Sequence, residues 1–144
     1  MAAPLIDRLR IKPGMTVLLL NAPDDFAQKL EPLPADVTLE TRTDGLYAAV
    51  IAVFRNQAEA NDLSATAAGA VRKEGLLWTC YPKTSGALKT DLTRDKGWAM
   101  LYGLGWGPVS QIAVDADWSA LRWRPESDVQ RKGGKTWSER QRTG

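Results

Sequence analysis

The sequence predicts an α/β domain built on an open, mostly parallel sheet of about six strands, with helices on both faces and an antiparallel hairpin at its C-terminal end. Three short, predominantly apolar runs, at 16–20, 47–54 and 76–81, are typical of strands buried on both faces. Helix-like segments separate these runs, which favours parallel strands joined by crossovers. The last two predicted strands are close enough in the chain to pair as a hairpin.

The first part of the chain contains a central strand, a short helix and an edge strand. A Pro13-Gly14 turn leads into the strand at 16–20. Two aspartates follow, and because negative charge suits a helix N-terminus, residues 26–33 are expected to form a short helix. Residues 37–42 alternate apolar and polar side chains, which predicts a strand with one solvated face.

The middle of the chain is interpreted as a strand, a long helix and another strand. Residues 47–54 form the second apolar run. Residues 56–73 are rich in alanine, with glutamate, glutamine and aspartate among them, which predicts a long helix. Gly75 follows as a helix C-cap, and the strand at 76–81 begins directly after it.

The last part of the folded chain begins with a loop over 82–90. A helix is expected to follow it up to about residue 104, with Thr90 or Thr93 as its N-cap. Two glycines then end the helix. The closing hairpin is predicted from the strands 109–115 and 118–124.

Composition excludes several classes of function. The chain has no histidine, which removes histidine-based acid–base chemistry and nearly every zinc site. Its single cysteine, Cys80, cannot form an internal disulfide. The first ten residues are too polar for a signal peptide, and no apolar run reaches transmembrane length. We therefore expect a cytoplasmic protein with no membrane contact.

The charge of the chain divides it into a neutral domain, 1–125, and a basic tail, 126–144. The tail holds five basic and three acidic residues, which accounts for the whole net charge of +2. A neutral domain argues against nucleic-acid binding, which needs clustered cations. The polar composition of the tail predicts disorder, although Trp137 allows a docking contact with an acidic partner.

The loop after the third apolar strand has the composition of an anion site. Ligands of open parallel sheets bind at the carboxyl ends of the strands, where the strand order reverses. Lys83 and Lys89 supply positive charge, Thr84 and Ser85 supply hydroxyls, and Gly86 is expected to let backbone N–H groups face outward. The N-terminus of the next helix would add partial positive charge. Asp91 argues for the alternative, a solvated loop whose side chains only cap that helix.

Other side chains near the same predicted edge could bind a ligand or could serve only the structure. Asn21 follows the first strand there, and Trp118 is a candidate for stacking on a ligand. Asp91, Asp115 and Asp117 could converge on Lys83 as a carboxylate cluster, although aspartates are also ordinary turn residues and their spacing predicts no metal site. Arg122 is expected to pair with Asp115 or Asp117. Cys80 is expected to be inert packing inside a strand.

Three segments resemble parts of the class I methyltransferase fold: 11–18 at its first strand, 71–78 at a late helix–strand entry, and 107–124 at its closing hairpin. The resemblance implies a shortened Rossmann-like sheet with the strand order 2-1-3-4-6-5. In that family, glycines after the first strand let the backbone approach S-adenosylmethionine, but residues 21–26 contain none. Binding a nucleoside cofactor would then need Asp24 or Glu40 to reach its ribose.

Residues 9–124 also resemble a family of small bacterial proteins defined as a domain of unknown function. The resemblance is carried by the segments 78–86, 90–95 and 114–122. It supports the predicted fold and implies no activity.

The sequence leaves three hypotheses of function. The first is a non-catalytic binding or regulatory module, without a resident cofactor, that holds a small anion or a protein partner at the carboxyl edge of the sheet. The second is a degenerate methyltransferase-like enzyme that binds a nucleoside-containing cofactor such as S-adenosylmethionine. The third is an adaptor that docks through its basic tail. The predicted ligand-binding residues are Asn21, Lys83, Thr84, Ser85, Gly86, Asp91, Asp117 and Trp118.

Overall fold

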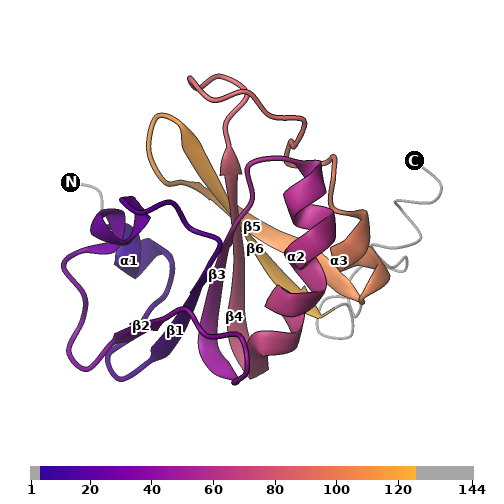
Figure 1. The fold of residues 1–144 in the computed structure, drawn as a ribbon. Coiled ribbons are helices and arrows are strands. Elements are labelled where there is room, and N and C mark those ends of the chain that lie inside the picture. Colours follow the sequence, from indigo (N-terminus) through magenta and orange to yellow (C-terminus); the bar gives the residue numbers. More distant parts are fainter. Residues whose placement is uncertain (1–3, 126–144) are drawn as a thin grey trace.

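The computed structural model describes residues 4–125, which form one six-stranded sheet in the order β2-β1-β3-β4-β6-β5 (Figure 1). Strands β1 to β4 are parallel, and β6 pairs antiparallel with both β4 and β5. This arrangement confirms the predicted fold class, strand order and closing hairpin. The strands are β1 (Thr16–Leu20), β2 (Thr38–Glu40), β3 (Tyr47–Val53), β4 (Val71–Pro82), β5 (Trp106–Ala113) and β6 (Trp118–Pro125).

One face of the sheet is covered by α2 (Gln57–Ala70) and α3 (Ala99–Gly103) (Figure 1). Alanines of α2 pack on the apolar side chains of the strands, because small residues let the helix lie close to the sheet. Several aromatic side chains pack beside these alanines, and the ring centroids of Trp98 and Trp123 are 5.5 Å apart. Asn56 caps α2 by accepting a hydrogen bond from the backbone N–H of Glu59.

The other face is covered by two short helices, α1 (Leu5–Arg8) and the 3-10 helix η1 (Phe26–Leu30). Phe26 and Leu30 are fully buried there. The indole N–H of Trp78 donates to the main-chain carbonyl of Leu9 at 2.9 Å, which ties the N-terminal segment to the sheet. Helices therefore lie on both faces, as the sequence predicts.

The boundaries of all three predicted helices are wrong. The helix expected at 56–73 ends at Ala70, because Val71 already pairs with Tyr47 as the first residue of β4. The helix expected at 26–33 is the single 3-10 segment η1, followed by a proline-containing stretch. The helix expected before residue 104 is reduced to the five residues of α3.

Long-range hydrogen bonds explain why residues 90–95 are not helical. The hydroxyl of Thr90 donates to the carbonyl of Arg55, and a carboxylate oxygen of Asp91 accepts from the backbone N–H of Gln57. Thr93 accepts from the N–H of Asp95 within its own turn. These side chains bind the start of α2 and their own loop, so they cap no helix of their own.

The outer strands of the sheet are short or irregular. β2 has three residues, and β5 carries a register shift between Pro108 and Ser110. No helix of the described residues is long and apolar enough to cross a membrane. The basic tail 126–144 lies outside the described residues.

Candidate functional site

A cavity of about 260 Å³ lies at the carboxyl end of β4, where the loop after this strand meets β5 and β6. It brings together three of the predicted binding residues, Lys83, Thr84 and Ser85. The other lining residues were not predicted from the sequence; they are Tyr81, Thr93, Arg94, Gln111 and Ser119.

The missed residues come from segments whose placement depends on the sheet. Ser119 faces Tyr81 across the β4–β6 pairing, a contact that follows from the register of β6 against β4. Arg94 was assigned to a helix, and it lines the cavity because the segment around it is a loop. A correct register of β6 against β4 would therefore have identified Tyr81 and Ser119 as neighbours.

Positive charge and hydroxyl groups surround the cavity. Arg94 forms an ion pair with Asp95 at 2.7 Å, so its charge is partly compensated. Burial raises the pKa of Tyr81, although the nearby Arg94 acts in the opposite direction. The amide of Gln111 donates to the Tyr81 hydroxyl at 2.9 Å. Tyr81 is therefore a neutral phenol at physiological pH, and the cavity presents two cations beside neutral hydroxyls.

The backbone of the Lys83 loop does not present its N–H groups in the predicted way. The N–H of Lys83 donates to the carbonyl of Asp117 at 2.8 Å, and that of Gly86 donates to the carbonyl of Lys83 at 3.1 Å. The N–H of Ala87 donates to the carboxylate of Asp117 at 2.9 Å. These three N–H groups therefore do not face outward, because they close the turn and bind it to the hairpin.

Gly86 instead allows a close backbone contact. A Cβ atom at this position would lie 2.9 Å from the Cα of Asp117 and 3.2 Å from the carbonyl oxygen of Ala116. The loop can therefore lie against the β5–β6 turn only with glycine there.

The predicted carboxylate cluster is not formed. Asp91 binds the N-terminus of α2, Asp117 binds the Lys83 loop, and Asp115 forms an ion pair with Lys29 at 2.7 Å. The helix N-terminus expected near Asp91 is also absent. Within the described part of the chain, no group of three or more acidic or cysteine side chains is arranged to hold a metal ion.

Two further predictions about this edge are wrong. Arg122 pairs with neither Asp115 nor Asp117, and its Nε atom donates to the hydroxyl of Ser110 at 3.4 Å. Trp118 is buried against Phe26, with ring centroids 6.1 Å apart, so it cannot stack on a ligand at the surface.

Asn21 lies at the point where the strand order reverses, between β1 and β3. Its backbone is left-handed, with φ 61°, and its side-chain amide donates to the carbonyl of Val53 at 2.7 Å and to the carboxylate of Glu59 at 2.9 Å. Glu59 also forms an ion pair with Arg55 at 2.7 Å. Partial burial acts to raise the pKa of Glu59, but the hydrogen bonds from Arg55 and Asn21 outweigh it and lower the pKa. Asn21, Arg55 and Glu59 therefore form one network of hydrogen bonds and charges at the carboxyl ends of β1 and β3.

This arrangement fits an adenosyl cofactor only in part. Glu40 ends β2, beside β1, where an acidic side chain could meet a ribose. Asn21, however, stands where a backbone approach to the cofactor would need glycine, and it is engaged by Val53 and Glu59. Asp24 lies exposed in the turn between β1 and η1.

The chain matches no protein-family model and no curated protein sequence. The predicted membership of a bacterial domain family therefore stays a prediction.

Solved structures resemble the chain in fold. The DhpI–SAH complex has a TM-score of 0.55 at 15% identity, with 83% of this chain and 81% of that chain covered. The DhpI-SAM-HEP complex has a TM-score of 0.56 at 14% identity, with 83% of each chain covered. The N-methyltransferase NodS from Bradyrhizobium japonicum WM9, in complex with S-adenosyl-l-homocysteine, has a TM-score of 0.51 at 11% identity, with 84% of each chain covered. At these identities the likeness concerns the fold alone, and the chain has the Rossmann-like fold of class I methyltransferases.

Proposed function

We propose that this domain is a small-molecule-binding module that holds an organic anion in the cavity beside Lys83. One observation carries the proposal: Lys83 and Arg94 line the same cavity of about 260 Å³ as several hydroxyl groups. Cations and hydroxyls in a concave site are the groups that bind phosphate or carboxylate. The hydroxyl groups belong to Tyr81, Thr84, Ser85, Thr93 and Ser119.

A second candidate is binding of an S-adenosyl compound at the ends of β1 and β2. The comparisons favour it, because two of the similar structures are complexes with S-adenosylhomocysteine. Glu40 would bind the ribose hydroxyls in this case. The bonded Asn21 side chain and the missing glycines weaken this candidate relative to the Lys83 cavity.

Isothermal titration with inorganic phosphate and with S-adenosylhomocysteine distinguishes the two candidates. If the Lys83 cavity binds anions, Lys83→Ala and Arg94→Ala weaken phosphate binding by about tenfold each, the size expected for losing a charged hydrogen bond. Lys89→Ala is the matched control, because Lys89 is an exposed cation of the same loop that does not line the cavity.

Each result of these titrations supports or excludes one of the two candidate sites. S-Adenosylhomocysteine binding that is lost in Glu40→Gln but kept in Lys83→Ala would replace the first candidate with the second. Phosphate binding that is equal in all the variants would remove the Lys83 cavity as the site. If neither compound releases heat or raises the melting temperature, both small-molecule candidates are wrong.

A further inference from the structure

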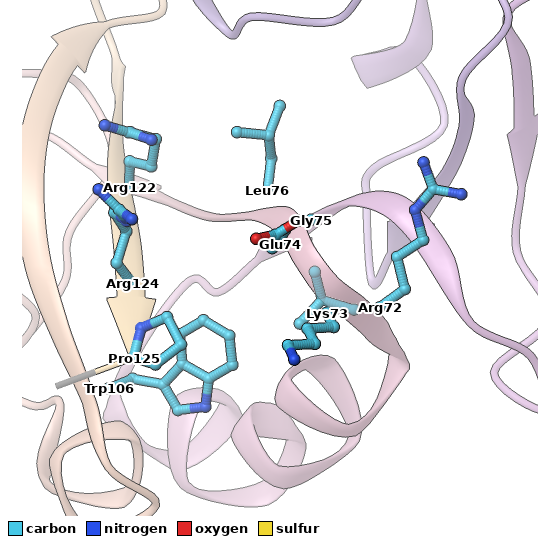
Figure 2. Close-up of a pocket in the computed structure, with 10 residues that line it drawn as sticks. Arg72, Lys73, Glu74, Gly75, Leu76, Trp106, Arg122, Arg124 and Pro125 are labelled. Atoms are coloured by element: carbon cyan, nitrogen blue, oxygen red, sulfur yellow. The ribbon is translucent and has the colours of Figure 1, made fainter. Parts of the chain in front are cut away.

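A second cavity, of about 630 Å³, opens at the opposite edge of the sheet, where β4 and β5 begin and β6 ends (Figure 2). Four basic residues line it, and one acidic residue, Glu74, lies among them. Leu76, Trp106 and Pro125 provide apolar lining. We call this cavity the Arg122 pocket; its basic residues are Arg72, Lys73, Arg122 and Arg124.

Arg122 and Arg124 form one wall of the pocket. They are two positions apart on β6, so their side chains leave the same face of the strand, and Figure 2 shows them one above the other. Lys73 extends from β4 toward the side where Trp106 lies (Figure 2). Three cationic side chains from two strands therefore face one space.

The charge of Arg122 is poorly compensated. Burial lowers the pKa of Arg122, and repulsion from Arg10 and Arg124 lowers it further. Its side chain donates only a long hydrogen bond, to the neutral hydroxyl of Ser110 at 3.4 Å. Among residues 4–125, no carboxylate forms an ion pair with Arg122, Arg72 or Lys73. Because arginine stays protonated at neutral pH, an anion in the pocket would relieve this repulsion.

The pocket has the size and chemistry for an organic phosphate. Its volume lies within the range of about 300–1,000 Å³ that is usual for small-molecule sites. Guanidinium groups bind phosphate oxygens in pairs of parallel hydrogen bonds, which favours Arg122 and Arg124 as phosphate ligands. Trp106, which is partly exposed, offers a flat apolar surface next to them.

We propose that the Arg122 pocket binds a nucleotide, with its phosphate groups against Arg122, Arg124 and Lys73 and its base against Trp106. The nucleotide can be free or part of a single-stranded nucleic acid, because both present the same phosphate and ring chemistry. The net neutrality of residues 1–125 does not oppose this proposal, because the cations are concentrated at one edge of the sheet. The site is separate from the Lys83 cavity, so each can fail without the other.

The test is titration of the full-length chain with ATP, and with a short single-stranded oligonucleotide, at constant ionic strength. Arg122→Gln and Arg124→Gln are each expected to weaken ATP binding at least tenfold. The matched control is Arg42→Gln, which removes the same charge from an exposed residue after β2 and leaves ATP binding unchanged. Trp106→Leu is expected to weaken ATP more than inorganic pyrophosphate, since pyrophosphate has no base. Stronger binding of the oligonucleotide than of ATP assigns the pocket to a nucleic-acid strand, and the reverse assigns it to a free nucleotide.

Three results would overturn the proposal. One is the absence of ATP and oligonucleotide binding at millimolar concentration in a folded protein. Another is ATP binding that Lys83→Ala removes and Arg122→Gln leaves unchanged, which would move the nucleotide to the other cavity. The third is a rise in melting temperature that sodium chloride reproduces at matched ionic strength, which would indicate screening of the arginine repulsion alone. Circular dichroism confirms the fold of each variant, and Arg122→Lys replaces Arg122→Gln if that chain does not fold.

Discussion

The side-chain amide of Asn21 lies 2.7 Å from the carbonyl oxygen of Val53 and joins the carboxyl ends of β1 and β3. The same amide reaches Glu59 of α2. Two neighbouring strands and the helix that follows the second are thus held together at the position where open α/β sheets usually accept a ligand. This relationship is the main structural reason why the Lys83 cavity is favoured over an adenosyl site.

Asn21 is expected to stabilise the fold through both its side chain and its backbone. Asn21→Ala removes two hydrogen bonds. It also places alanine, which has no polar side chain to stabilise a left-handed backbone, at φ 61°, so the free energy of unfolding should fall by about 1–3 kcal/mol. Asn21→Gly loses the same bonds but tolerates the backbone, so it should cost less. Urea denaturation of both variants measures the difference, and a glycine variant less stable than the alanine variant would contradict this account.

The Lys29–Asp115 pair predicts a loss of stability in acid. Partial burial acts to raise the pKa of Asp115, but hydrogen bonds from Lys29 and from the N–H groups of Asp117 and Trp118 outweigh it and lower the pKa. A carboxyl whose pKa is lower in the folded state stabilises the fold above its unfolded pKa, about 3.9, and this contribution disappears as the pH falls through the folded pKa. Asp115→Asn should therefore flatten the fall in stability below about pH 4.

The size of this acid effect should be small. The side chains of Lys29 and Asp115 are 30% and 35% exposed, so solvent screening limits the charge contribution to about 1 kcal/mol or less. Melting temperatures between pH 2 and pH 7 measure it. Asp24→Asn, the same substitution at an exposed turn position, is the control variant.

The buried hydroxyl of Thr79 should be sensitive to substitution. It accepts a hydrogen bond from the indole N–H of Trp123 at 3.0 Å, and Thr79 is 0% exposed. Thr79→Val keeps the shape but leaves that N–H without an acceptor, which should cost about 1–3 kcal/mol. Thr38→Val, an exposed position on β2, should change stability by less than about 0.5 kcal/mol. Equal urea midpoints for the two variants would show that the indole finds another partner.

Gly86 and Gly103 form a matched pair for testing the Lys83 loop. A methyl group at Gly86 collides with the backbone of residues 116 and 117, so Gly86→Ala should move the loop, lower the melting temperature and weaken phosphate binding severalfold. No atom lies within 4 Å of a Cβ at Gly103, so Gly103→Ala should be neutral or stabilise the protein by up to about 1 kcal/mol. A Gly86→Ala variant with unchanged melting temperature and phosphate affinity would mean that the loop position does not matter.

Cys80 should report on unfolding. Burial raises the pKa of its thiol to about 12, and Asp115 adds to the effect. The thiolate is the reactive form, so the folded protein should not react with a thiol reagent at pH 8, and the rate should follow the population of open molecules. Modification as fast in buffer as in urea would contradict the buried position.

The sheet could be predicted from the sequence because its central strands are buried on both faces. Residues 16–20, 47–54 and 76–81 are apolar apart from Thr16 and Thr79, and such short apolar runs are typical of a strand between two layers. The strand at 71–75 was missed, since Arg72, Lys73 and Glu74 are good helix formers. Pairing of Val71 with Tyr47 of β3 overrides that local preference.

The candidate site could be predicted only where it is local in sequence. Lys83, Thr84 and Ser85 are adjacent, so their shared cavity follows from one loop. Lys29 and Asp115 are 86 positions apart, and nothing in either neighbourhood indicates the other. Asp91 resembles a local helix cap, yet its acceptor serves Gln57 of another helix. Sequence patterns gave no information on such long-range partners.

The two outer strands have a consequence for the behaviour of the protein at high concentration. An exposed strand with a long row of free N–H and C=O groups is a template on which a second chain can add. β2 offers only three residues, and β5 contains Pro108, which has no N–H, followed by a shift in register. Neither border of the sheet offers a long regular ladder, so we expect this domain to resist strand-mediated aggregation.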